Sequence, residues 1–267
     1  MSMKEDILSH LSPQYPWGEQ LHYYEEIGST NDVLKAMAKE GAHHGTAVIA
    51  GFQTNGHGRM GRTFLSPKNA GVYLSILLRP NCPPSQLMHL TCATAVAMCG
   101  ALEAAAGVSP QIKWTNDLVF GKRKLGGILT ELGLTAQGGV SYAIIGIGIN
   151  CCQRESDFDP SIRDMAASLS MAAGRPISRA KVAAAMLDAL YQMDLRLLTG
   201  KAEMLETYRK KCVTVGQDVS LLRGDEVRHG HALDVDEEGA LVVLFPDGHR
   251  EHIASGEVSV RGMYHYV

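Results

Sequence analysis

Residues 51–62, GFQTNGHGRMGR, combine glycines with arginines directly after an apolar stretch. Glycine lets the backbone adopt positive φ and approach a ligand closely, and the forked guanidinium of arginine matches phosphate or carboxylate. These residue types predict a loop that closes over an anionic ligand. Glycine-rich basic loops are also common as mobile surface turns, and the segment by itself leaves both interpretations open.

The spacing excludes two familiar phosphate-binding loops. The segment lacks the Lys-Ser or Lys-Thr ending of a Walker A loop. Gly56, Gly58 and Gly61 open no predicted helix, which separates them from a dinucleotide-binding fingerprint.

Two predicted strands further along the chain carry lysines beside polar residues. The run 111–120, QIKWTNDLVF, contains Lys113 and is broken at TND, which includes Asp117. KLGGILTELGL begins at Lys124 after a basic turn and is expected to be its hairpin partner. The lysines can neutralise an anion. Solvated strand-end charges and an Asx turn at Asp117 are the simpler alternatives.

Small and hydroxyl side chains elsewhere can also meet a ligand. Gly146 and Gly148 alternate on one face of a predicted strand, which leaves a slot for a flat ligand or, alternatively, room for a buried helix. Ser29, Thr30 and Asn31 precede a predicted helix, where they either cap it or reach a ligand.

The elements that position these residues mix strands with helices. Ser85 is expected to cap a helix that is apolar nearly all round and therefore buried across the sheet. The segment of 16 residues between Thr54 and Gly71 is too long for a hairpin turn, which favours a functional loop. Strands are expected at 21–30, 46–54, 71–80, 111–120, 124–134 and 141–151, and helices at 33–40, 86–107, 178–198 and 201–211.

The pattern of apolar and polar residues along the chain changes near Val213. Short alternating strands then follow, with turns at Arg223-Gly224-Asp225, Glu238-Gly239 and Asp247-Gly248. This pattern predicts a small β-barrel of SH3-like size. The expected fold is α+β: a mixed β-sheet packed with helices over residues 1–212 and the small β domain over 213–267.

Composition restricts the class of protein. The 25 Lys and Arg residues nearly balance 28 Asp and Glu residues, which argues against nucleic acid as the main partner. The six cysteines form no CxxC pair, and the N-terminus has no apolar stretch of signal-peptide length. We therefore expect a cytoplasmic protein that binds neither DNA nor a membrane.

Five strings occur in an order that resembles the biotin protein ligases along essentially the whole chain. They are GHGRMGR after FQT, KWTND, KLGGILTE, GIGIN, and DEEGALVV with SGEVSVR. The resemblance implies a catalytic domain like those of class II synthetases and biotin and lipoyl ligases. Because some members carry an additional N-terminal DNA-binding domain and the first twenty residues here are short and polar, we expect the monofunctional, non-repressor type.

The resemblance implies site residues position by position. Lys124, Arg59 and Lys113 are implied in catalysis, and Asp117 in holding Mg²⁺. The residues implied in binding biotin are Ser29, Thr30, Asn31, Gln53, Gly56, His57, Gly58, Arg59, Lys124, Gly127, Leu129, Gly146 and Gly148. Those implied in binding ATP are Arg59, Arg62, Phe64, Asn116, Asn150, Ile162 and Ala166, with Leu169 as further apolar cover.

The chain departs from the family pattern at two positions. His57 stands where the family usually has arginine, which makes one phosphate contact doubtful or pH-dependent. Thr115 stands where proline is usual, which is expected to loosen a turn.

The implied activity has two steps. Biotin is activated by ATP to biotinyl-5'-AMP with release of pyrophosphate, and biotin then passes to a lysine of a biotin carboxyl carrier protein or domain. A lipoate ligase or octanoyltransferase of the same fold, a biotin-sensing repressor and a non-catalytic binding module stay open as alternatives. The acceptor carboxylase and the choice between monomer and homodimer are open too.

Overall fold

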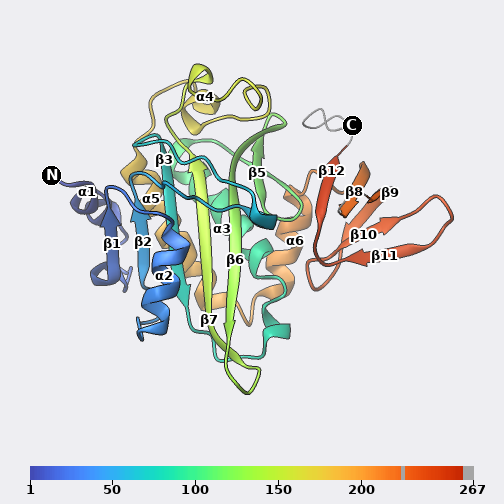
Figure 1. The fold of residues 1–267 in the computed structure, drawn as a ribbon, viewed down its shortest axis with the longest axis horizontal. Coiled ribbons are helices and arrows are strands. Elements are labelled where there is room, and N and C mark those ends of the chain that lie inside the picture. The colour runs from blue at the N-terminus through green and yellow to red at the C-terminus, as the bar shows by residue number, and fades with distance from the viewer. Residues whose placement is uncertain (224–225, 261–267) are drawn as a thin grey trace.

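The computed structural model describes residues 1–223 and 226–260. Its largest element is a seven-stranded sheet in the order β1-β2-β3-β7-β6-β5-β4 (Figure 1). β1 and β2 pair in parallel and the other neighbours pair antiparallel, as expected for a mixed sheet. The strands are β1 (Leu21–Tyr24), β2 (Ala47–Ala50), β3 (Gly71–Leu78), β4 (Gln111–Lys113), β5 (Asp117–Phe120), β6 (Arg123–Leu134) and β7 (Val140–Asn150).

Helices cover both faces of this sheet. In Figure 1, α3 and α5 lie behind the sheet, whereas α2 lies in front of it. The α-helices are α1 (Met3–His10), α2 (Thr30–Lys39), α3 (Leu90–Ala106), α4 (Leu169–Ala173), α5 (Arg179–Arg196) and α6 (Lys201–Lys211). The short 3-10 helices are η1 (Gly18–Gln20), η2 (Arg59–Gly61), η3 (Pro84–Leu87) and η4 (Glu155–Asp157).

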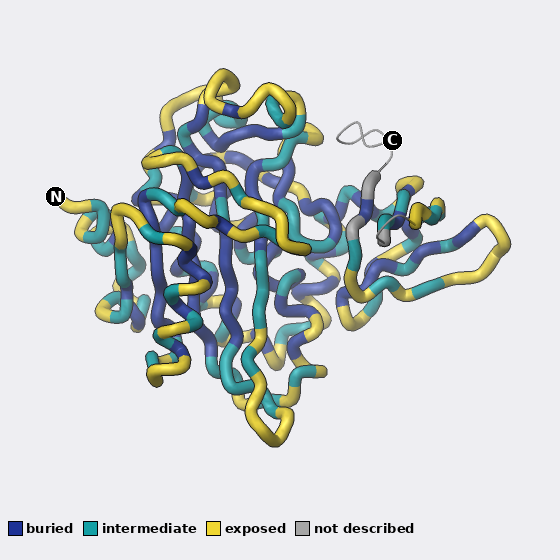
Figure 2. The backbone as a smooth tube through the Cα atoms, viewed as in Figure 1, coloured by how far each residue is buried: buried dark blue, intermediate teal, exposed yellow. Residues whose placement is uncertain are grey.

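The alternation of side chains along β3 assigns the two faces. Leu74 and Ile76 belong to the main core, and Leu77 packs with Leu34 of α2 on the opposite face. Ser75 shares the face of Leu77 and stands opposite Gly146 of β7. The glycines of β7 therefore open on the α2 side. Figure 2 shows that β3 and β7 are buried over most of their length.

Helix α3 is the predicted buried helix, but the prediction of its start was wrong. Pro84 opens the 3-10 turn η3, which contains Ser85, and α3 begins only at Leu90. Pro84–Ala106 is the one stretch of the described residues that is long and apolar enough to cross a membrane, with a mean hydropathy of 1.4. Most of it is buried against α5 and the sheet, which is how a core helix meets the same criterion.

The short polar N-terminal segment begins with a helix that the sequence analysis did not predict. Ser2 and Glu5 form a reciprocal capping box that starts α1. This helix packs on α5, and just beyond it the Ser12 backbone N–H donates to Asp188 at 3.0 Å.

The predicted small β domain is confirmed. Its strands, in the order β11-β10-β9-β8-β12, are all antiparallel. The bounds are β8 (Asp218–Arg223), β9 (Glu226–Val235), β10 (Leu241–Leu244), β11 (Arg250–Ile253) and β12 (Glu257–Val260). Within the described part of the chain β11 and β12 do not pair, so this sheet is not a closed barrel. The turn predicted at Gly224-Asp225 lies outside the described residues.

Candidate active site

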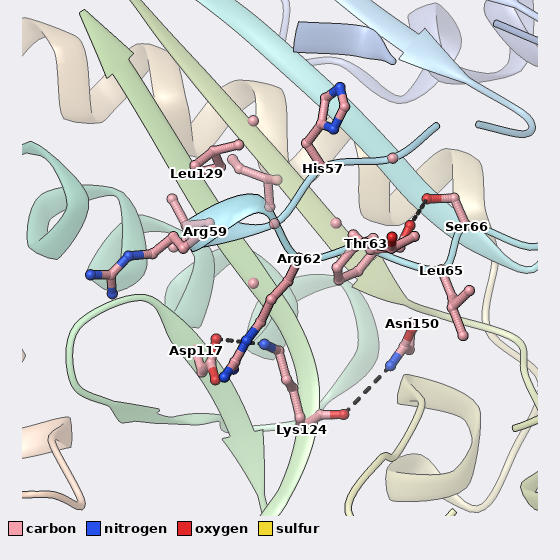
Figure 3. Close-up of a pocket in the computed structure, with 18 of the residues that line it drawn as sticks. His57, Arg59, Arg62, Thr63, Leu65, Ser66, Asp117, Lys124, Leu129 and Asn150 are labelled. Carbon is pink, nitrogen blue, oxygen red and sulfur yellow. Dashed lines mark hydrogen bonds and ion pairs between the residues drawn. The ribbon is translucent and has the colours of Figure 1, made fainter. Parts of the chain in front are cut away.

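A cavity of about 710 Å³ opens on the α2 side of the large sheet (Figure 3). Its wall combines the start of α2, the glycine loop, strands β5 to β7, residues 157–166 and the edge of the small domain. Every residue implied in binding biotin, ATP or metal lines this cavity. Leu169 does not; it starts α4 and is fully buried in the main core, so its prediction as cover was wrong.

One end of the cavity is neutral and rich in hydrogen bonds. The Thr30 backbone N–H donates to Gln53 Oε1 at 2.8 Å, and Gln53 Nε2 donates to Ser66 Oγ at 2.9 Å. Ser29 precedes α2 in the cap position, but its side chain makes no capping bond to any described residue. The Ser29 hydroxyl therefore lines the cavity without capping α2, whereas the Gln53 carboxamide accepts the first backbone N–H of that helix.

The slot predicted above the β7 glycines is already filled by the protein. A Cβ on Gly146 would lie 2.2 Å from Asn31 Oδ1, and one on Gly148 would lie 2.3 Å from the Phe64 ring. The glycines admit a carboxamide and an aromatic ring, both of which form part of the cavity wall. They shape the site through these two side chains.

The glycine loop folds back on itself beside the cavity. The Gly58 N–H donates to Arg62 O at 2.7 Å, and the Phe64 N–H donates to Gly56 O at 2.9 Å. A Cβ on Gly56 would lie 2.5 Å from Phe64 O, so this close approach requires glycine. Gly61 has a φ of 73°, which glycine also adopts without strain.

The other end of the cavity carries cations. Lys124 Nζ lies 2.7 Å from Asp117 Oδ1, and Figure 3 shows Arg62 pointing toward this pair. Lys113 is only 8% exposed, so it is not the solvated strand-end charge of the simpler alternative. Several positive charges close to one carboxylate favour the binding of anions.

Arg59 points away from Lys124 in Figure 3 and joins the two domains. Its guanidinium donates to Asn116 Oδ1 at 2.9 Å and to the carbonyl of Gly256 at 3.2 Å. Asn116 in turn donates to Ile128 O at 3.0 Å. In this conformation Arg59 ties the glycine loop to the hairpin and to the small domain.

His57, a departure from the family pattern, is paired with helix α2. Its Nε2 lies 2.8 Å from Asp32 Oδ2, and Lys35 Nζ lies 3.4 Å from Asp32 Oδ1. Partial burial raises the pKa of Asp32, but the hydrogen bonds and charges of His57 and Lys35 outweigh it and hold the pKa below its usual value. Thr115, the other departure, accepts a hydrogen bond from buried Tyr208 at 3.0 Å.

A covering segment lies across the cationic end. The Lys124 backbone N–H donates to Met165 O at 2.7 Å, and the Lys124 carbonyl accepts from the Ala167 N–H at 2.9 Å. Residues 165–167 therefore pair with the start of β6. Asn150 donates to Ala167 O at 3.1 Å and accepts from Gln153. The Asn150 side chain therefore holds the covering segment in place.

Asp117 fits a divalent cation only as one ligand among several. The described residues contain no group of three or more His, Cys, Asp or Glu side chains that could hold a metal. Mg²⁺ is commonly held by one or two carboxylates together with substrate phosphates, and this donor set is compatible with that arrangement.

Several lining residues were missed by sequence reasoning. Ser66, Phe158 and Met165 line the cavity, as do Gly256 and Val258 of the small domain. Ser75 and Glu131 contact the lining residue Asn31. Ser75 could have been noticed in the sequence, because it is a small polar residue in the otherwise apolar strand GVYLSILL.

Two family models match the chain. The biotin/lipoate A/B protein ligase family matches residues 23–150, and the biotin protein ligase C-terminal domain matches residues 214–261. A bifunctional ligase/repressor of Bacillus subtilis is 35% identical over 232 residues, which cover 86% of this chain and 71% of that protein. A biotin–[acetyl-CoA-carboxylase] ligase of Mycobacterium tuberculosis is 30% identical, with coverage of 90% and 88%.

Solved structures give the same assignment. The biotin protein ligase of Aquifex aeolicus in complex with biotin and ATP matches with a TM-score of 0.76 and 30% identity, covering 90% of this chain and 98% of that one. The match spans both the large sheet and the small domain. Together with the order of the motifs around one cavity, these comparisons show that the chain belongs to the biotin protein ligases of the biotin/lipoate A/B protein ligase family.

Proposed function

We propose that this chain is a biotin–[biotin carboxyl carrier protein] ligase that makes biotinyl-5'-AMP from biotin and ATP and passes biotin to a carrier lysine. The observation that carries the proposal is the two-ended cavity. Thr30 and Gln53 offer neutral hydrogen bonds at one end, and Lys124 and Arg62 lie at the other. A ligand with a polar neutral ring and a distant carboxylate matches both ends.

The first step needs position and charge rather than a protein nucleophile. A carboxylate oxygen of biotin forms a bond to the α-phosphorus of ATP, and pyrophosphate leaves. None of the six cysteines, all of which the structure describes, lines the cavity. Lys124 would leave Asp117 for the substrate carboxylate and α-phosphate and offset their repulsion.

Asp117 would hold a Mg²⁺ ion together with the phosphates of ATP. The ion supplies charge that stabilises the leaving pyrophosphate. Lys113 and Arg62 would bind phosphate oxygens from the walls of the cavity, because both are cationic and line it.

In the second step the amine of a carrier lysine attacks the acyl carbonyl, and AMP leaves. The glycine loop and the covering segment near Met165 would exclude water, which otherwise hydrolyses an acyl-adenylate. Arg59 would keep the loop in place through Asn116 and Gly256.

The decisive experiment incubates the protein with biotin, Mg-ATP and a carrier domain and then determines the mass of the carrier. We expect one biotinyl group on the carrier and none on a carrier whose acceptor lysine is replaced by arginine. Lipoate and octanoate serve as alternative donors. Transfer of either in preference to biotin would overturn the proposed substrate.

Three broader features belong to the same proposal. The acceptor is a carrier domain of a biotin-dependent carboxylase, the enzyme acts in the cytoplasm, and it does so without DNA. Sedimentation with and without biotin and ATP would decide between monomer and homodimer.

A further inference from the structure

A pair of ionisable side chains connects the glycine loop to helix α2. The base of the loop is attached by backbone hydrogen bonds, among them one from the Asn55 N–H to Gly28 O at 2.8 Å. Two residues further along, His57 Nε2 lies 2.8 Å from Asp32 Oδ2 in the first turn of α2. This contact, the His57–Asp32 tether, therefore joins the loop to the helix at a second level.

The tether connects two walls of the neutral end of the cavity. Chain neighbours of both partners line this end, namely Gly56 and Gly58 in the loop and Thr30 and Asn31 in α2. Asp32 itself is not among the described residues that line the cavity. Figure 3 shows His57 and Lys124 on opposite sides of the glycine loop. The charge of His57 therefore acts on the position of the loop, at a distance from the cationic end.

Neighbouring cations keep Asp32 ionised. Lys35 Nζ lies 3.4 Å from Asp32 Oδ1 and 2.7 Å from Glu131 Oε1 on β6. Partial burial opposes the ionisation of Asp32, but the hydrogen bonds and charges of His57 and Lys35 hold its pKa below the usual value. The carboxylate is therefore charged throughout the range between about pH 5 and 8, in which histidine ordinarily changes charge.

Protonation of the imidazole ring changes the tether from a hydrogen bond into an ion pair. A carboxylate only accepts hydrogen bonds, so His57 Nε2 carries a proton in either state and the second proton is added at Nδ1. The cations of the loop itself have other directions: Arg59 reaches Asn116, and Arg62 points toward the pair of Lys124 and Asp117. Among these residue types only histidine ordinarily titrates near neutral pH.

We propose that Asp32 is a positioning residue that holds the glycine loop against α2 through protonated His57, so that biotin binding is coupled to the uptake of a proton. The inference rests on the proposed function and deepens it. Biotin favours the loop position that the tether stabilises, and that position favours the protonated ring. By linkage, biotin is held more tightly as the pH falls through the histidine range and less tightly as it rises. An arginine, which is usual in the family at this position, would not titrate.

The exposure of the two side chains sets the size of the effect. His57 is 37% exposed and Asp32 is 49% exposed, so water and salt screen their attraction. We expect the affinity for biotin to fall about threefold between pH 6 and 8. A coupling of this size corresponds to the uptake of at most about 0.3 proton for each biotin bound.

Titration calorimetry with biotin alone, at pH 6.5 in buffers of different ionisation enthalpy, measures the proton uptake. Asp32→Asn keeps the shape of the side chain and should lower the uptake from about 0.3 to less than about 0.1 proton, with an affinity that no longer varies between pH 6 and 8. His57→Arg should also abolish the uptake. The matched control is His231→Gln in the small domain, where His231 lies 2.9 Å from Asp218; it should keep the wild-type uptake. Equal uptake in the wild type and Asp32→Asn would overturn the inference.

A measurement without ligand separates this inference from the proposed function. In ¹⁵N-labelled protein at pH 6.5, the signal of His57 Nε2 should move in Asp32→Asn, because its hydrogen-bond acceptor loses its charge, and it should not move in His231→Gln. A His57 signal that does not respond to Asp32→Asn would overturn the inference even if biotin is the substrate. A wild-type protein that does not bind biotin, with a His57 signal that does respond, would overturn the proposed function and leave the tether standing.

Discussion

At the scale of single residues, Lys124 combines exposure with a fixed position. Its side chain is 37% exposed and is held 2.7 Å from Asp117 at the cationic end of the cavity. A lysine with this exposure contributes little to packing, so its charge is available for the substrate. Its backbone also bonds the covering segment, and that contact does not depend on the side chain.

Lys124→Met should therefore lower the rate of pyrophosphate release by about 10²–10³-fold and leave the melting temperature nearly unchanged. Lys122→Met, at an exposed position in the preceding turn, is the matched control and should retain full activity. Exchange of label between pyrophosphate and ATP measures the step. A Lys124→Met rate equal to that of Lys122→Met would contradict the assigned role.

The cysteines make a second prediction at this scale. A hydrogen bond from Cys151, opposed by partial burial and aided by Arg179, lowers the pKa of Cys152 to about 7. Burial raises the pKa of Cys92 and of Cys99 to about 12. The thiolate is the reactive form, and its fraction on Cys152 grows as the pH rises through the pKa.

Iodoacetamide should consequently label Cys152 first at pH 7.5, and the labelling rate should fall about tenfold for each pH unit well below 7. Peptide mass mapping after a short exposure shows which cysteines carry the label, with Cys152→Ser as the control. Labelling of Cys92 or Cys99 in the folded protein at a rate similar to that of Cys152 would contradict this prediction.

At the scale of elements, the loop of residues 54–66 combines a conformationally free backbone with specific side-chain contacts. Met60 and Gly61 adopt positive φ, and Arg59 contacts both Asn116 and Gly256. Ordering such a loop costs about 1–2 kcal/mol of backbone entropy per residue, so ligand contacts must favour the closed form.

Hydrogen exchange should show slower exchange of the Gly58 and Phe64 amides, which bond within the loop, when biotin is bound. Amides of β7 serve as the internal control and should not change. Arg59→Gly should reduce the gain in protection and let activated biotin reach unrelated proteins in the same tube. Equal protection of the loop with and without biotin would rule out closure.

At the scale of the whole molecule, the two domains share one core and one cavity wall. The indole N–H of Trp114 donates to Gly239 O at 2.9 Å, and Val213 bonds Ile112 across the predicted boundary at 212/213. Lys201 also pairs with Glu238 at 2.6 Å. The small domain is therefore a structural part of the site.

Trp114→Phe leaves the buried Gly239 carbonyl without its indole donor, which should cost about 1–3 kcal/mol. The small domain should detach more often, so a protease should cut faster between residues 212 and 218. Trp17→Phe makes the same substitution far from this contact and should leave the cleavage rate unchanged. Equal cleavage in both variants would show that the Trp114 bond does not hold the domains together.

The alternation along strands and the turn pattern predicted the mixed sheet and the small β domain, and the resemblance to the family singled out residues that line one cavity. Local sequence contains this information, because strand parity places Gly146 and Gly148 on one face whatever covers them. The α5 helix was predicted for the same reason, since the inward Val182 and Met186 follow its period.

Tertiary structure decided what the pattern left open. Asn31 and Phe64, which come from other segments, fill the space over the β7 glycines. Ser75 and Glu131 both contact Asn31 only because β3, β6 and the start of α2 come together in the fold. Hydrogen-bond direction depends on which donors and acceptors meet across such distances in the chain, and residue types and their spacing do not specify those meetings.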